Sequence, residues 1–282
     1  MTAPALDLKG RTLAETLPAL QDRVRKEPGD AKLRTFLFQL LAVMGSWERA
    51  IAQLSLAGEL DPAAIPMTQM YGDALKCEAL RAEVFAGKRT PVVFGDPDPW
   101  IALMIEALKL SAAGEHVRAA ELRAQALEQA PATSGSVVTM NDKAQGDEPP
   151  AGTAFAWIAD ADSRLGPILE VIVNGRYMWV PLTRVHRIDI DPPEDLRDMV
   201  WTPAHIEWAN GGETICMIPT RYAGTEAAPE DAIRLARRTE WTEVAAGAYH
   251  GVGQRMFATD ANEYPILELR RITLETAAPG GA

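Results

Sequence analysis

Asp160, Asp162 and Arg164 occupy alternate positions and are the residues of this sequence best suited to chemistry. Two carboxylates spaced in this way could bind a metal ion or act as a general acid and base. The support for a metal site is weak, because calcium takes many oxygen ligands and magnesium keeps water or phosphate ligands. Alternatively, the carboxylates cap turn amides and pair with Arg164. We favour this second, architectural interpretation.

The other candidate motifs are incomplete. His205-Ile-Glu207 matches the start of a zinc deaminase signature, but the second half of that signature is absent because Cys216 stands alone. The histidines and serines show no metal-binding or nucleophile-elbow spacing. The glycines around Gly251 lack the Lys-Ser/Thr end of a phosphate-binding loop, and we expect a tight turn between strands there. We therefore expect no catalytic residue, no metal and no cofactor, and predict that the protein is not an enzyme.

The polar loop leads into a predicted β-hairpin. A β-branched run at residues 168–173 is followed by Asn174-Gly175 and a second strand-like run at 176–182. An Asn-Gly pair between two such runs predicts a type I′ turn, because that turn needs a positive φ at both central residues. A second hairpin is predicted over 205–218, with its turn at residues 210–212.

The loop and the first hairpin together form our candidate site, which we interpret as structural or partner-binding. Aromatic residues recur in this half of the chain, and we expect Trp157, Trp179, Trp201, Trp208 and Trp241 to lie in the core of a sheet. The candidate site residues are Trp157, Asp160, Asp162, Arg164, Gly166, Pro167, Asn174, Gly175, Tyr177 and Trp179.

Apolar residues in the first half of the chain recur every three or four positions, which predicts helices over residues 12–130. Within them, Gly45, Ala50, Ala57 and Pro62 recur 69 residues later as Gly114, Ala119, Ala126 and Pro131. That offset is about twice the 34-residue tetratricopeptide period. We predict a tetratricopeptide-like helical array, with a plain helical bundle as the alternative.

The periodicity divides the chain into three parts. Residues 1–132 are the predicted helical domain, and residues 133–152 lose all periodicity and are predicted to be a linker. Residues 153–282 read as many short strands with few helices. The predicted fold class is therefore α+β and multidomain, with a mostly antiparallel, barrel-like β domain after the helices.

Composition narrows the class of protein. The 282-residue chain is 47% apolar and 24% charged, as is typical of globular proteins, and its net charge of −11 disfavours nucleic acid and anionic membranes as partners. Two cysteines support neither a disulfide framework nor a zinc site. We find no apolar segment typical of a signal peptide or of a membrane-spanning helix, and we expect a cytoplasmic protein.

Several longer segments resemble one known family. They are FAWIADADSRLGPILEVIVNGRYMWVPL, PEDLRDMVW, NGGE, IPTRYAG, RLARRTEW and GVGQR, and they occur in the same order as in the ImpE family, also called SciE or TagJ. They cover about residues 153–274, and the helical half is similar to the family in length and character.

This resemblance implies an accessory protein of the bacterial type VI secretion system. It implies a tetratricopeptide-like domain joined to a β-rich domain, a contractile-sheath subunit (TssB-like) as partner, and a link to the sheath-recycling ATPase ClpV. We therefore predict a non-enzymatic adaptor. Two alternatives stay open: an enzyme that uses the Asp160, Asp162 and Arg164 loop on a small molecule or metal, and a structural subunit that forms a homo-oligomer.

Overall fold

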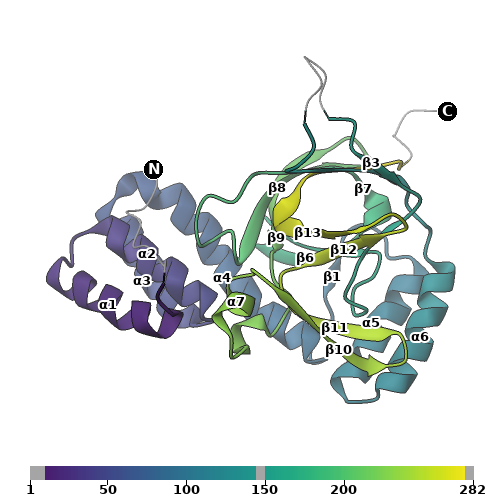
Figure 1. The fold of residues 1–282 in the computed structure, drawn as a ribbon, viewed down its shortest axis with the longest axis horizontal. Coiled ribbons are helices and arrows are strands. Elements are labelled where there is room, and N and C mark those ends of the chain that lie inside the picture. Colours follow the sequence, from purple (N-terminus) through teal and green to yellow (C-terminus); the bar gives the residue numbers. More distant parts are fainter. Residues whose placement is uncertain (1–9, 144–149, 277–282) are drawn as a thin grey trace.

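A computed structural model describes residues 10–143 and 150–276 of the chain. Helices α1–α3 lie at one end of the molecule, the curved sheet lies at the other, and the long helix α4 joins them (Figure 1). Helices α5 and α6 lie on the far side of the sheet from α1–α3 (Figure 1). The expected α+β class is therefore confirmed. None of the helices in these two ranges is long and apolar enough to cross a membrane.

The helices begin where the sequence supplies caps. Thr12 and Glu15 form a reciprocal capping box at the start of α1. The Asp30 carboxylate accepts hydrogen bonds from the amides of Lys32 and Leu33 at the start of α2. The helices are α1 (Leu13–Lys26), α2 (Ala31–Val43), α3 (Trp47–Leu60), α4 (Ile65–Phe85), α5 (Pro99–Ala112), α6 (His116–Gln129) and α7 (Asp231–Arg234), and a 3-10 helix, η1 (Pro62–Ala64), precedes α4.

The 69-residue repeat marks two similar helix pairs, α2–α3 and α5–α6. Gly45 and Gly114 follow the first helix of each pair with φ of +70° and +83°, which favours glycine at a helix end. Ala50, Ala57 and their counterparts Ala119 and Ala126 are fully buried. However, α4 and the sheet separate the two pairs (Figure 1). The predicted continuous tetratricopeptide-like array is therefore not confirmed.

The β half is built on one nine-stranded sheet in the order β1-β6-β5-β9-β8-β7-β14-β2-β3, antiparallel except for β1 beside β6. Its strands are β1 (Val92–Val93), β2 (Gly135–Thr139), β3 (Thr153–Phe155), β5 (Ile168–Val173), β6 (Arg176–Pro181), β7 (Val185–Ile190), β8 (Trp201–Trp208), β9 (Glu213–Pro219) and β14 (Leu269–Leu274). The outer strands β1 and β3 do not pair with each other, so the sheet is open and the expected barrel is not confirmed.

Two smaller sheets complete the fold. One joins β13, β12 and β4, and the other is the hairpin of β10 and β11. Their strands are β4 (Ile158–Asp160), β10 (Thr239–Ala245), β11 (Ala248–Gly253), β12 (Met256–Thr259) and β13 (Glu263–Pro265). Gly251 and Gly253 belong to β11, so the expected turn at these glycines is wrong. Gly251 lies opposite Trp241, where a Cβ would come within 2.5 Å of the Tyr222 ring.

The predicted linker is partly wrong. Residues 135–139 form β2, which pairs with β14 on one side and β3 on the other. Val137 of this strand is fully buried, so tertiary contacts rather than local periodicity hold the segment in the sheet. Residues 144–149 of the predicted linker lie outside the described residues.

Both predicted hairpins are confirmed. Strands β5 and β6 pair from Ile168 with Pro181 to Val173 with Arg176, and strands β8 and β9 pair from Trp201 with Pro219 to Glu207 with Glu213. The first turn has φ of 49° at Asn174 and 71° at Gly175, as a type I′ turn requires.

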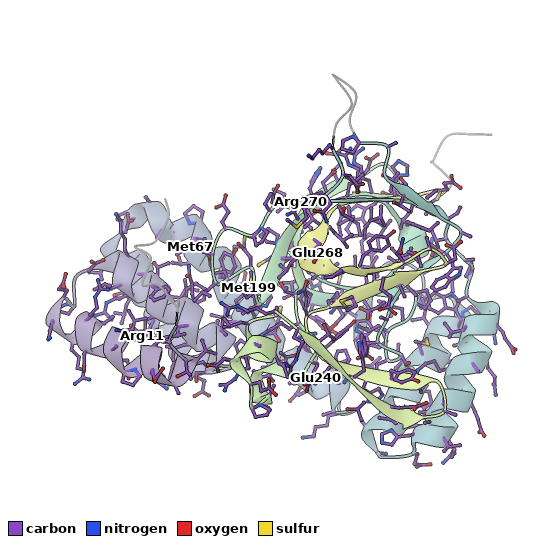
Figure 2. The ribbon with its side chains drawn as sticks, in the orientation of Figure 1. Arg11, Met67, Met199, Glu240, Glu268 and Arg270 are labelled. Atoms are coloured by element: carbon purple, nitrogen blue, oxygen red, sulfur yellow. The ribbon has the colours of Figure 1, made fainter. Side chains whose placement is uncertain are left out.

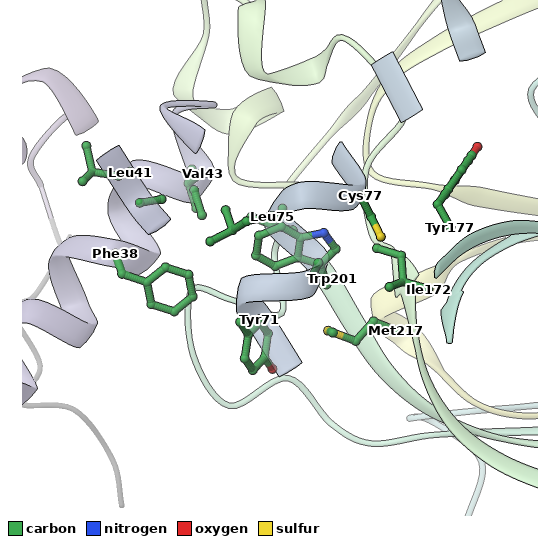
Figure 3. Packing of buried hydrophobic residues seen from close by; sticks show 14 of the residues in the cluster. Phe38, Leu41, Val43, Tyr71, Leu75, Cys77, Ile172, Tyr177, Trp201 and Met217 are labelled. Carbon is green, nitrogen blue, oxygen red and sulfur yellow. The ribbon is translucent and has the colours of Figure 1, made fainter. Parts of the chain in front are cut away.

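Strand β5 lies between two apolar cores, and all six of its residues are buried. Ile168 and Ile172 face the helices, whereas Leu169 and Val171 face a second core inside the curved sheet. Figure 3 shows the first core, in which Tyr71 and Leu75 of α4 pack beside Trp201 and Met217 of the sheet. Helices and sheet therefore share buried apolar surface, which is the main favourable contribution to folding.

We expect Gly175→Ala to lower the free energy of unfolding by about 1–2 kcal/mol, because an L-residue is strained at this positive φ. The added Cβ would also lie 2.9 Å from Asp73 Oδ2 of α4. Gly72→Ala is the matched control, because it adds a methyl group in a helix where nothing lies within 4 Å of its Cβ. We expect this control to be neutral or stabilising by about 1 kcal/mol. Urea denaturation of both variants checks the prediction, and equal stabilities would contradict the turn geometry.

Candidate functional site

Glu170 lies in the middle of β5 and is completely buried. It faces the helices, as Ile168 and Ile172 do, because side chains alternate along a strand. A buried carboxylate destabilises the fold unless other groups pair with it and donate hydrogen bonds. Glu170 is the centre of a set of buried polar side chains, which we call the ion network. Its other members are Glu78, Arg81, Asp160, Tyr177, Tyr222 and Arg255.

The helical half supplies Arg81 to the network. From α4, Arg81 Nε lies 2.7 Å from Glu170 Oε1, and its Nη2 lies 3.1 Å from Glu170 Oε2 and 2.7 Å from the carbonyl oxygen of Arg221. Glu78, one turn earlier on α4, pairs with Arg81 and accepts a 2.9 Å hydrogen bond from the Trp201 indole. These contacts tie α4 to three strands or loops of the β half.

The β half supplies the remaining donors to Glu170. Tyr177 of β6 donates to Glu170 Oε1 at 2.6 Å, and the Trp179 indole donates to the Tyr177 hydroxyl at 2.8 Å. Arg255 pairs with Glu170 through one terminal nitrogen and with Asp160 through the other. Arg255 is fully buried, so its charge depends on these two carboxylates.

Asp160 and Asp162 organise the polar loop. Asp160 Oδ1 accepts from the amide of Asp162 at 2.8 Å and lies 3.0 Å from the Tyr222 hydroxyl. Asp162 accepts from the amides of Arg164 and Gly251, each at 2.8 Å, and forms a two-point ion pair with the Arg164 guanidinium. The carboxylates therefore satisfy turn and strand amides and pair with arginines, as the architectural interpretation expects.

The network also replaces backbone pairing. Strands β5 and β9 pair at Ile172 and Met217, and no further pair between them is formed in the described residues. Beyond that point Arg255 Nε donates to the carbonyl oxygen of Pro219 at 2.8 Å, and Arg81 donates to that of Arg221. The guanidinium groups thus satisfy carbonyls that a neighbouring strand would otherwise pair with.

The network fixes the charge of Glu170. Burial alone would raise the pKa of Glu170, but Arg81 and Arg255 outweigh it and lower the pKa to about 2. Burial raises the pKa of Asp160 to about 7, against the opposing effect of Arg255. Burial also raises the pKa of Tyr177 well above its ordinary value, so its hydroxyl stays a donor to Glu170.

A smaller polar cluster lies where α5, α6 and β11 meet. Ser111 Oγ lies 3.2 Å from His250 Nε2 and 3.4 Å from His116 Nδ1. Burial lowers the pKa of His250 to about 4, and the nearby Arg164 lowers it further. His250 is therefore neutral in the folded protein near pH 7, and it links the β10–β11 hairpin to the helices.

The structure brings together part of the predicted site. Asp160, Asp162, Arg164, Tyr177 and Trp179 belong to the ion network or contact it, and Gly166 and Pro167 end the loop beside it. Asn174 and Gly175 lie at the other end of the hairpin, near α4. Trp157 is 40% exposed and Trp241 is 37% exposed, so the expectation of sheet core is wrong for these two tryptophans.

Five residues of the ion network were not predicted as site residues from the sequence: Glu78, Arg81, Glu170, Tyr222 and Arg255. Glu170 carries a local signal, because it is the one charged residue in the run ILEVIV. Glu78 and Arg81 carry a weaker one, an oppositely charged pair three residues apart in a helix. No local pattern connects Arg81 to a carboxylate 89 residues later.

The polar groups of the ion network pair with one another and with backbone groups of the same chain. Its carboxylate oxygens accept hydrogen bonds from arginines, a tyrosine and amides of the same chain. Among residues 10–143 and 150–276, no group of three or more histidine, cysteine or acidic side chains is placed to hold a metal ion. Asp160, Asp162 and Arg164 are thus paired with groups of the same chain.

Comparison with known proteins identifies the family of this chain. The ImpE protein family matches residues 152–273. The type VI secretion system accessory component TagJ of Pseudomonas aeruginosa is 49% identical over 268 residues, covering 95% of this chain and 89% of that protein. The chain belongs to the ImpE family. The crystal structure of protein VPA1032 from Vibrio parahaemolyticus has the same fold, with a TM-score of 0.78, 23% identity and coverage of 93% of both chains.

The residues that match the ImpE family include only part of the ion network. It contains Asp160, Glu170 and Arg255, but it begins after α4, which supplies Glu78 and Arg81. The helical half therefore supplies one of the two arginines that neutralise Glu170, and the ImpE segment supplies the other.

We expect Arg255→Met to lower the free energy of unfolding by about 3–5 kcal/mol, because it leaves two buried carboxylates short of a partner. Arg255→Lys should show a smaller loss, because it keeps the positive charge although one ammonium cannot bridge both carboxylates in the same way. Arg89→Met is the matched control, because Arg89 is 64% exposed where it pairs with Glu83. This control should change stability by about 0–1 kcal/mol. Denaturant unfolding checks the order, and equal losses for Arg255→Met and Arg89→Met would contradict it.

His250 should make stability depend on pH. Its pKa falls from the ordinary value of 6.5 to about 4 on folding, so the unfolded chain binds the proton more readily. Its contribution to stability is therefore complete above pH 6.5 and is lost as the pH falls towards 4. We expect His250→Asn to be less stable than the wild type at pH 7.5, with the difference shrinking at lower pH. Parallel stability curves for the two proteins between pH 7.5 and 4.5 would count against this assignment.

Proposed function

We propose that this protein is a non-enzymatic accessory component of a type VI secretion system. One observation carries the proposal: the 49% identity to the accessory component TagJ extends over 95% of this chain. The site geometry supports the non-enzymatic part, because the carboxylates best suited to catalysis are occupied by arginines and amides of the same chain. We also propose that this protein is located in the cytoplasm.

The proposed partner is a contractile-sheath subunit of the TssB type, with a link to sheath assembly or to recycling by ClpV. We propose that a helical segment of that subunit lies in a groove of this protein. Such recognition needs an apolar groove that accepts anchors about one helical turn apart, with charged groups at its rim to set the register.

A groove of about 290 Å³ at the helical end offers apolar and charged groups that support this proposal. Ala31, Ala63, Ala64 and Met67 line it, and Lys32, Arg197 and Asp61 supply charges of both signs. Leu60 and Ile65, which flank residues 61–64 at the groove, are 43% and 44% exposed. Met67, labelled in Figure 2, lies on α4 at the helical end of the molecule. We propose that this groove, which we call the α2–α4 groove, receives the sheath segment.

A pairwise binding measurement with purified sheath subunits tests the proposal. We expect the wild type to bind the small sheath subunit, and Met67→Glu to weaken binding at least about tenfold by placing a carboxylate among apolar anchors. Val117→Glu is the matched control, because Val117 is 65% exposed on α6, at the opposite end of the molecule (Figure 1). It should bind as the wild type does.

The outcomes separate the competing functions. If no sheath subunit binds and the protein has a defined dimer mass, the structural-subunit alternative replaces the adaptor. If a divalent ion raises the melting temperature of the wild type but not that of Asp162→Asn, the enzyme alternative replaces it. If the wild type binds and Met67→Glu binds equally well, the adaptor stands and the groove assignment is wrong.

A further inference from the structure

We infer that a second cleft, at the β1 end of the sheet, binds an organic carboxylate that carries an aromatic or other apolar group. The cleft has a volume of about 540 Å³, within the range of about 300–1,000 Å³ that is usual for small-molecule sites. Its walls come from the segment after β1, the 3-10 helix η2 (Leu182–Arg184) and the β8–β9 turn. The lining residues that carry the argument are Phe94, Gly95, Thr183, Arg184, Trp208 and Asn210.

Hydrogen-bond donors without acceptors gather in this cleft. Arg184 Nε is buried and has no partner in the described part of the chain. Asn210 uses its oxygen to accept from the amide of Gly212 at 3.0 Å, which leaves its NH₂ group as a donor. A donor-rich cleft suits a ligand that brings acceptors.

The Arg184 side chain is 41% exposed, and its guanidinium donates to one carbonyl oxygen and forms one long ion pair. Its Nη2 donates to the carbonyl oxygen of Asp96 at 3.2 Å, and the nearest carboxylate, Asp98 Oδ2, is 4.0 Å away. At Gly95, whose φ is +76°, a Cβ would lie 3.7 Å from Arg184 Nε, so the glycine leaves space beside the guanidinium. Arg184 Nη1 and Nη2 thus keep free N–H groups, and such a planar fork matches the two oxygens of a carboxylate.

The rest of the cleft selects the remainder of the ligand. Phe94 and Trp208 stack with ring centroids 4.3 Å apart and an interplanar angle of 20°. They form an aromatic wall, against which a planar or apolar group packs favourably. The net charge of −11 opposes the binding of any anion, and it opposes a divalent phosphate more than a monovalent carboxylate.

Benzoate is a suitable probe, with benzamide as the uncharged molecule of the same shape and inorganic phosphate as the competing anion. Isothermal titration calorimetry of the full chain gives affinities, and amide NMR locates the ligand. We expect saturable binding of benzoate with shifts at Gly95, Ala209 and Asn210, and binding of benzamide and phosphate at least about tenfold weaker.

Two substitutions with opposite expected effects complete the test. Arg184→Gln should weaken benzoate at least about tenfold, because it removes the charged fork. Asp98→Asn should strengthen benzoate, because it removes the anion that competes for Arg184. Absent or non-saturable binding, equal affinity for benzamide, tighter binding of phosphate, or unchanged affinity in Arg184→Gln would each overturn the inference. Because none of these measurements involves sheath subunits, their outcome is independent of the proposed function.

Discussion

The fold depends on keeping one carboxylate charged inside a sheet. Glu170 lies in the middle of β5, a strand with an apolar core on each face, and it is completely buried. Its charge is tolerable only because Arg81 and Arg255 approach it from separate parts of the chain. Much of the surrounding geometry follows from this requirement, including the orientation of α4 and the early end of pairing between β5 and β9.

The same requirement joins the two halves of the molecule. Arg81 belongs to the helical half, and Glu170, Arg255 and Asp160 belong to the β half. The shared apolar core, in which Tyr71 and Leu75 meet Trp201 and Met217, surrounds this connection (Figure 3). An ion pair inside apolar surroundings favours one relative arrangement of the two halves, because any other leaves charges unpaired. That arrangement also fixes the α2–α4 groove, since α4 and Arg197 come from different halves.

Local chemistry predicted local structure well. Asn174-Gly175 specified its turn, Asp30 capped its helix, and the polar loop proved rich in Asx-type contacts. Long-range partners were not predictable, because nothing near Glu170 in sequence indicates which arginine neutralises it. Strand β2 was missed for a related reason. Its five residues are short and lie in a polar stretch, and their pairing with β14 and β3 decides their conformation. Gly251 was misplaced because a glycine needed for close packing against Tyr222 looks, in sequence, like a glycine needed for a turn.

Native-state hydrogen exchange tests most directly whether the ion network makes the helices and sheet one cooperative unit. Amides of α4 around Arg81 and amides of β5 around Glu170 should exchange only through global unfolding, with the same free energy. Arg81→Met should lower both free energies together by about 3–5 kcal/mol. If α4 exchanges at a clearly lower free energy than β5 in the wild type, or if Arg81→Met affects α4 alone, the two halves unfold independently and the ion network does not join them.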